Sequence, residues 1–151
     1  MKKKTKIIIG VVGAVLLIAV LAVAGVMLYL GGKWNSNRKF DEYVYSEGPW
    51  GFESTWVSEN GNSYLVCDNT NLDKGSVTAW FKNDEEWTEY EMSGMNRMVY
   101  LDVVRDGVVV ESSSAYMKFD GTTFTIYDLD KEVFGAAEFN YSLTDESFSP
   151  R

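Results

Sequence analysis

The sequence predicts an all-β domain that follows a single N-terminal transmembrane helix, and three observations support this prediction. Residues 7–30 are uncharged and overwhelmingly apolar. After Pro49, Val, Thr, Tyr, Phe and Trp alternate with polar residues in short runs. The dipeptides Asn60-Gly61, Asp106-Gly107 and Asp120-Gly121, which favour tight hairpins, separate several of these runs. This pattern predicts an antiparallel meander that forms a closed or partly open barrel, with a β-sandwich as the alternative.

Residues 7–30 have the length of a membrane span. A helix of this length measures about 36 Å, and the hydrocarbon core of a bilayer needs about 20 apolar residues. The short segment 1–6 carries four lysines, and this bias in positive charge favours a cytoplasmic N-terminus. We therefore expect a single-pass cell-membrane protein with membrane lipid around residues 7–30, a cytoplasmic stub at 1–6 and an extracytoplasmic remainder.

A cleaved signal peptide is the alternative interpretation of the same segment. Ala22-Val23-Ala24 has the small-x-small pattern of a signal-peptidase site. The apolar run continues through Gly25 to Leu30, however, so cleavage after Ala24 would fall inside the hydrocarbon rather than at its edge. An uncleaved anchor is the expectation that fits the whole run.

Charge excludes one class of partner for the part of the chain beyond the apolar segment. Ten of the 14 Lys and Arg residues stand there against all 22 Asp and Glu residues, a net charge of −12. Nucleic-acid affinity comes mainly from basic residues that neutralise phosphates. We therefore expect no nucleic-acid partner.

The composition also argues against an enzyme. The chain has no histidine, which is the usual general base near neutral pH and the commonest metal ligand. Its one cysteine, Cys67, cannot form a disulfide within the chain. Because it lies in the apolar run 64–67, it is expected to be a small buried hydrophobe, with intermolecular pairing as the alternative. No catalytic residue, metal site or cofactor is predicted.

Beyond the apolar segment, residues 31–48 are expected to be a tether and residues 49–151 a β-domain without a helical stripe. Phe40, Tyr43 and Tyr45 offer an alternative, in which they begin the folded domain or form a short helix that lies against it. The predicted strands are residues 52–59, 63–67, 76–82, 87–92, 97–105, 108–112, 115–119, 123–129 and 138–143. A short final strand is expected to include Phe148, in a hairpin spaced like that of residues 119–124.

Alternation within these strands predicts which side chains face the interior. The expected inward set is Phe52, Trp56, Val77, Ala79, Phe81, Val99, Leu101, Val103, Met117, Phe119, Phe124, Ile126, Phe139, Tyr141 and Leu143. On the strand 87–92, Tyr90 and Met92 facing inward would place Trp87, Glu89 and Glu91 together on the outer face. That strip is either a cation-binding or carbohydrate-stacking surface or an edge strand protected by charge.

Three segments of the β-domain carry a family resemblance. Gly51-Phe52-Glu53-Ser54-Thr55-Trp56, the run from Tyr116 to Ile126, and Phe139-Asn140-Tyr141-Ser142-Leu143 resemble the lipocalin-like small β-domains of secreted and membrane-anchored Gram-positive bacterial proteins. Those domains have a tryptophan in the first strand and repeated hairpins of aromatic-x-Gly-x-x-apolar form. The resemblance departs at Ser149-Pro150-Arg151, which cuts the last strand short and leaves ring closure open.

Two acidic segments raise the question of calcium and are expected to be solvated loops. Asp128-Leu129-Asp130-Lys131-Glu132 contains a lysine and lacks a glycine turn. In the segment 68–75, Leu72 occupies a position that a calcium ligand would need, and Ala79 stands where a glutamate would be required.

The many aromatic residues have two interpretations: in a small barrel they would pack the core, and in a wider or less complete barrel they would line a cavity for one apolar ligand. We expect a non-catalytic binding domain for a small apolar ligand. The ligand-lining candidates are Trp56, Trp80, Phe81, Tyr100 and Tyr116. The alternative is a structural or protein-interaction module of a cell-envelope complex, which would bind through an exposed apolar face or a free strand edge.

Overall fold

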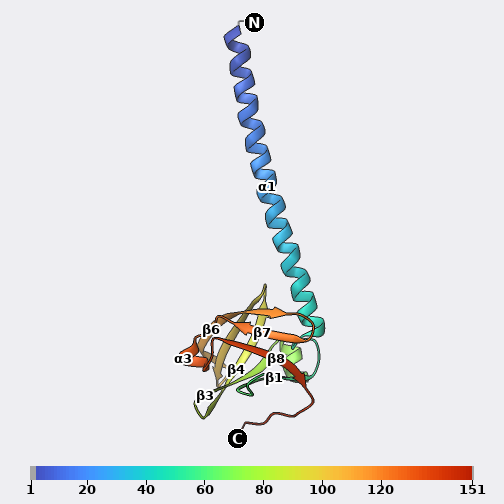
Figure 1. The fold of residues 1–151 in the computed structure, drawn as a ribbon, viewed down its shortest axis with the longest axis vertical. Helices are drawn as coiled ribbons and strands as arrows, with labels where there is room; N and C mark the ends of the chain where they lie inside the picture. Colours follow the sequence, from blue (N-terminus) through green and yellow to red (C-terminus); the bar gives the residue numbers. More distant parts are fainter. Residues whose placement is uncertain (1–2, 151) are drawn as a thin grey trace. The chain divides into compact units, whose positions relative to one another are not determined.

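The computed structural model describes residues 3–150, with side chains from residue 11 onward. Backbone contacts divide the chain into two units, residues 1–38 and residues 39–151, and each is described by itself. A single helix, α1 (Lys3–Glu47), makes up the first unit and continues into the second (Figure 1). The second unit contains every strand that the structure describes.

The first unit is helical throughout its described length. Its most apolar 18-residue window has a mean hydropathy of 3.0 and is not buried. By length and composition α1 can cross a membrane, and a signal sequence near an N-terminus has the same properties. The expected apolar N-terminal helix is therefore present.

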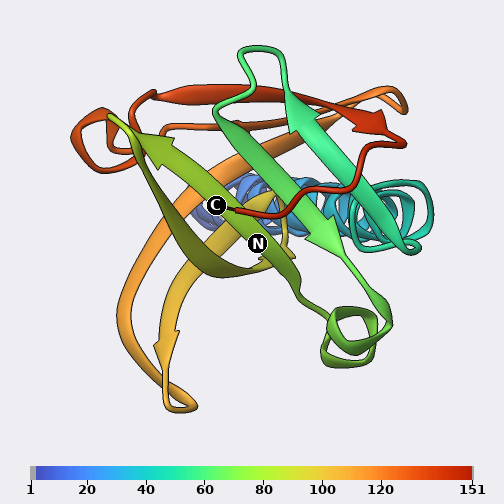
Figure 2. The ribbon, with the colours of Figure 1, turned by 90° about the horizontal axis from the view of Figure 1, so that it is seen from below.

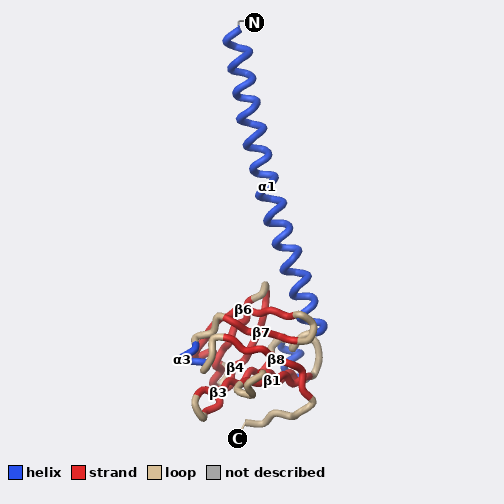
Figure 3. Tube along the Cα trace, viewed as in Figure 1, coloured by secondary structure: helices blue, strands red, loops and turns tan. Residues whose placement is uncertain are grey.

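The second unit is a closed antiparallel barrel in which each strand pairs with its neighbours in sequence (Figures 2 and 3). The ring closes because β1 also pairs with β8, with Trp56 opposite Leu143. This confirms the all-β barrel class and excludes the β-sandwich. The strands are β1 (Ser54–Ser58), β2 (Ser63–Cys67), β3 (Val77–Asn83), β4 (Glu86–Met95), β5 (Met98–Arg105), β6 (Val108–Phe119), β7 (Thr123–Tyr127) and β8 (Glu138–Thr144).

The three predicted dipeptides form the turns of three hairpins. Asn60-Gly61 lies between β1 and β2, Asp106-Gly107 between β5 and β6, and Asp120-Gly121 between β6 and β7. The glycine of each dipeptide has a positive φ, which a residue without a Cβ adopts at no steric cost.

Two expectations about the strands were wrong. The segments 108–112 and 115–119 form one strand, β6, because Ser113 and Ser114 keep their pairing with Leu101 and Tyr100 of β5. No described strand contains Phe148, which lies in an irregular segment after β8 and packs by ring contacts instead.

Two short helices interrupt the β-domain, where no helix was expected. In α2 (Asn69–Lys74), the Asp68 side chain accepts a hydrogen bond from the Asn71 N–H, and Gly75 ends the helix in the left-handed region. In α3 (Lys131–Phe134), Asp130 and Gly135 have the same two roles. The two acidic segments that raised the question of calcium, 68–75 and 128–132, therefore contain helix N-termini, and Asp68 and Asp130 cap them.

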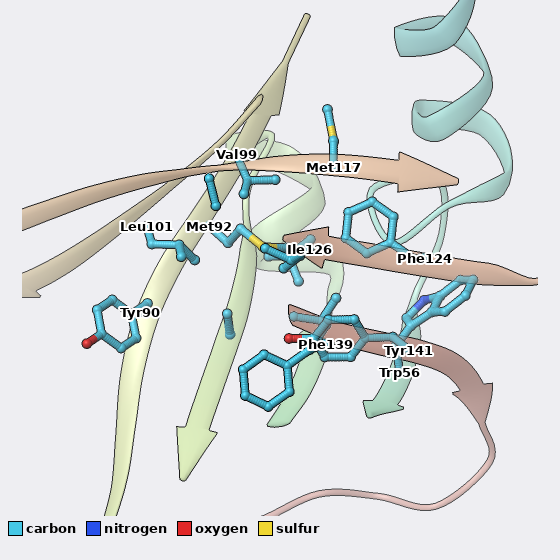
Figure 4. Close-up of a cluster of buried hydrophobic side chains, with 14 of the residues drawn as sticks. Trp56, Tyr90, Met92, Val99, Leu101, Met117, Phe124, Ile126, Phe139 and Tyr141 are labelled. Carbon is cyan, nitrogen blue, oxygen red and sulfur yellow. The ribbon is translucent and has the colours of Figure 1, made fainter. Parts of the chain in front are cut away.

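Alternation places the core correctly along most of the strands (Figure 4). Trp56, Phe81, Tyr90 and their inward neighbours are buried, while Val103 and Phe119 are partly buried. Phe52 and Leu143 were expected inside but are 39% and 51% exposed. Phe52 precedes the start of β1 in an irregular segment, and Leu143 lies near the end of β8.

Both ends of the barrel are covered by side chains from outside the sheet. At one end, Phe40 and Val44 of α1 and the nearby Trp50 are buried, and Trp50 packs edge-on against Phe124 at 5.6 Å between ring centroids. At the other, Phe134 of α3 packs on Phe81 at 4.9 Å. The expected tether 31–48 is therefore helical as far as Glu47, and from Lys39 onward it belongs to the folded unit.

Gly94 in β4 makes room for Trp50. A Cβ at this position would lie 2.9 Å from the Trp50 indole. The Tyr45 hydroxyl donates a hydrogen bond of 2.8 Å to the Gly94 carbonyl, so the end of α1 is also held at this point. The sequence prediction missed this contact because it is made by residues 49 positions apart.

A buried hydrogen-bond chain crosses the interior between β8, β2 and β3. The Ser63 hydroxyl donates to the Trp80 carbonyl at 2.7 Å and lies 2.7 Å from the Tyr141 hydroxyl. Because a hydroxyl has one proton to donate, Tyr141 is the donor to Ser63. Burial raises the pKa of Tyr141, which keeps this donor proton in place.

Replacing Tyr141 with phenylalanine tests this chain. The Tyr141→Phe variant removes the donor and should lower the free energy of unfolding by about 1 kcal/mol. Guanidinium unfolding of the full chain in micelles, followed by tryptophan fluorescence, measures this loss. Tyr100→Phe is the matched control, because Tyr100 is exposed and its variant should stay within about 0.5 kcal/mol of the native chain. Equal midpoints for the two variants would contradict the assignment.

Candidate functional site

The five predicted ligand-lining residues do not meet in one cavity. Trp56 and Phe81 face the interior and are each 2% exposed. Trp80 follows the buried Ala79, so alternation turns it outward, where it is half-buried. Tyr100 and Tyr116 are also outside, on β5 and β6, at 38% and 42% exposure.

Side chains fill the barrel interior, which was the expected position of an apolar ligand. Phe81 contacts the rings of Tyr90, Phe134 and Phe139 at centroid distances of 4.9 to 5.6 Å. Phe124, Ile126 and Tyr141 have no exposed surface. These inward aromatic rings therefore fill a closed core.

A groove of about 490 Å³ opens instead on the outside of the barrel. It exists because β4 pairs with β5 only from Glu91 to Met95, so the two strands separate over the earlier residues of β4. We call this feature the outer groove. Its lining residues are Asn71, Lys74, Thr78, Trp80, residues 87–91 of β4 and residues 103–105 of β5.

Two tryptophans of the outer groove belong to a cluster of four rings on the barrel exterior. Tyr64 and Phe148 stack at 4.0 Å between centroids, and Phe148 lies 5.9 Å from Trp80 and 5.0 Å from Trp87. Three of these rings alternate outward from β2, β3 and β4, and the fourth comes from the segment after β8. In Figure 2 this last segment crosses in front of the strands.

Polar groups of both signs surround the two tryptophans. Glu89 and Glu91 are exposed on β4, as sequence alternation predicts, and Lys74 and Arg105 line the same groove. Asn71 is held in place, because its side-chain amide donates to the Val66 carbonyl at 3.2 Å and to the Thr78 hydroxyl at 2.9 Å. These bonds fix α2 beside β3.

A second feature is the outer part of the β5–β6 hairpin. It carries the exposed aliphatic side chains of Val104, Val108, Val109 and Val110, and we call it the valine hairpin. Beyond the β-bulge at Val103 and Val104 its two strands pair only with each other. β6 has one edge on β5 and the other on β7, and it pairs with β7 only from Tyr116 to Phe119. From Val108 to Ala115, the edge of β6 on the β7 side therefore has no strand partner among residues 3–150.

The described residues 3–150 contain no group of three or more Asp, Glu, Cys or His side chains placed to hold a metal. The carboxylate of Asp120 accepts hydrogen bonds from the N–H groups of Thr122 and Thr123 at the β6–β7 turn. These bonds lower the pKa of Asp120, which is consistent with a turn-stabilising role.

Cys67 is buried at the end of β2, as the sequence predicts. Desolvation, with smaller contributions from the charges of Asp68 and Glu53, raises the pKa of its thiol to about 11. The thiolate is the reactive form of cysteine, so burial leaves little of this thiol in its reactive form near neutral pH.

A maleimide reagent at pH 8 tests the environment of Cys67. The folded chain should react at least about tenfold more slowly than the chain unfolded in guanidinium, because both access and thiolate content are reduced. Mass spectrometry over a time course measures the two rates. Equally rapid labelling in both states would show that Cys67 is accessible.

Comparison with known proteins supplies no relative for this geometry: no protein-family model, no curated protein and no solved structure matches the chain.

The sequence contained a signal for the valine hairpin. In the run Val103-Val104-Arg105-Asp106-Gly107-Val108-Val109-Val110, apolar residues stand on both faces of the strands instead of alternating with polar ones. The sequence predicted only part of the outer groove. Trp87, Glu89 and Glu91 share one strand, so alternation places them together, whereas Trp80 joins them through the pairing of β3 with β4.

Proposed function

We propose that the chain is a membrane-anchored, extracytoplasmic and non-catalytic interaction module that binds another protein of the cell envelope through the valine hairpin. One observation supports this proposal most directly. The hairpin combines exposed apolar side chains with an unpaired strand edge. Free edges that are long and apolar are sites of strand addition by a second chain.

The geometry gives less support to a small apolar ligand inside the barrel. Trp56 and Phe81 already pack within the core, and the other three expected lining residues lie outside it. The lipocalin-like kinship also remains a proposal, supported by an eight-stranded meander that closes on itself.

The partner segment can be described by its chemistry. Strand addition along residues 108–115 would satisfy the backbone groups of β6, and apolar side chains of the partner would cover the valines. Glu111 lies within this edge, and the chain beyond the apolar segment carries a net charge of −12. A neutral or basic strand of another protein therefore fits better than a second copy of this chain.

Membrane topology is the first test of the proposal. The cluster of lysines before the apolar segment supports a cytoplasmic N-terminus. Protease added to intact cells should then remove an epitope tag placed after Arg151, while a tag before Met1 should survive until the cells are opened. The opposite pattern of protection would overturn the topology and the proposed function together.

Photo-crosslinking in the native host tests the binding surface. A photoreactive residue in place of Val109 should yield a discrete adduct with one envelope protein, and the same residue in place of Glu59, in the β1–β2 turn, should not. Adding Val110→Lys should reduce the adduct at least about tenfold, because it puts a charge where an aliphatic side chain would be buried.

The matched charge control is Ser142→Lys, on the exposed face of β8, which should leave the Val109 adduct unchanged. Adducts of equal strength from positions 109 and 59, or an adduct insensitive to Val110→Lys, would overturn the role of the hairpin.

A further inference from the structure

We propose that the outer groove is a carbohydrate-binding site for a neutral oligosaccharide. The site borders the proposed protein contact at Val104, but Val108, Val109 and Val110 do not line the groove. It brings together tryptophan rings, carboxylates, cationic groups and hydroxyls around an open volume of about 490 Å³.

The two tryptophans supply the apolar part of the site. Trp80 and Trp87 project to the same side of the barrel, because Trp80 pairs opposite Glu89 and Lys82 opposite Trp87 in the β3–β4 register. An indole is flat and apolar and lacks an acceptor, so it suits the C–H face of a sugar ring. Both rings are only half-buried and line the groove, so part of each remains available.

The polar groups of the groove suit hydroxyls. Glu89 and Glu91 are acceptors, Lys74 and Arg105 are donors, and the hydroxyl of Thr88 can act as either. Sugar hydroxyls donate and accept, so a lining with both kinds of group can pair with them. A purely apolar ligand would leave these polar groups desolvated and without new partners.

The charge of the groove favours a neutral glycan over an anionic one. Within the lining, two carboxylates balance two cationic side chains, so no net positive charge is present to hold a polyanion. The rest of the chain beyond the apolar segment is acidic, with a net charge of −12, which disfavours phosphate-bearing or uronic-acid polymers further.

Phe148 limits the binding surface on one side. Its ring stacks on Tyr64 and makes a T-shaped contact with Trp87 at 5.0 Å between centroids, so the segment after β8 forms a wall beside the tryptophans. Val103 and Val104 of β5 form the opposite wall. A chain-like ligand would therefore lie along the gap between β4 and β5.

Isothermal titration calorimetry of the full chain in lipid nanodiscs tests the site, since sugar-based detergents would compete for it. The probes are chitohexaose, cellohexaose and maltohexaose, three neutral hexaoses that differ in linkage and substituents. We expect at least one of them to bind. Trp87→Ala should weaken that binding about tenfold or more, and Glu89→Gln should weaken it about threefold or more.

Two matched controls accompany these variants. Trp34→Ala removes a tryptophan that is 74% exposed on α1, and Glu138→Gln removes an exposed carboxylate of β8, so neither should change the affinity. Thermal unfolding reports whether Trp87→Ala still folds. If it does not, Glu89→Gln decides, because this exposed side chain has no role in the core.

Absence of binding by all three hexaoses would overturn the proposal. So would binding that survives Glu89→Gln and a folded Trp87→Ala unchanged, or binding that is lost equally in the controls. Crosslinking at Val109 is independent of these outcomes, so failure of the carbohydrate site and failure of the protein contact can be told apart.

Discussion

The pairing of β1 with β8 is the constraint on which the rest of the fold depends. It turns a meander of neighbouring strands into a ring and leaves β1 and β8 without a free edge where they meet. Once the ring is closed, inward side chains must fill a fixed interior, and residues from outside the sheet must cover its two ends. Trp50 and Phe134 do so from opposite sides, and Gly94 is required because the Trp50 indole leaves no space for a Cβ.

Both candidate binding surfaces arise from unequal strand lengths within this ring. β6 has 12 residues, whereas β7 has five, so the outer part of β6 extends past its neighbour. β5 follows β6 into the hairpin and thereby leaves the early residues of β4, which opens the groove. The same divergence thus produces an apolar edge on one side of the hairpin and a polar groove on the other.

Local sequence patterns were enough to predict the barrel class, the three dipeptide hairpins and most inward positions. They failed where a residue's role is decided by distant partners. Phe148 has the spacing of a strand residue, yet it packs on Tyr64, which lies far away in sequence. The last turns of α1 were expected to be a tether, with a helix against the folded domain as the alternative, and the burial of Phe40 and Val44 in the barrel unit supports that alternative. Trp80 and Tyr100 were named as ligand-lining candidates because of their aromatic character, whereas strand alternation places both of them on the outside.

The segment that carries Phe148 makes the exterior ring cluster easier to open than the barrel beneath it. Residues 145–150 belong to no described strand, and Phe148 contacts Tyr64, Trp80 and Trp87 through its ring. Local opening of this segment would uncover the face of Tyr64 on which Phe148 stacks, while the paired strands stay in place. The domain could therefore expose an adhesive aromatic surface without any loss of its barrel.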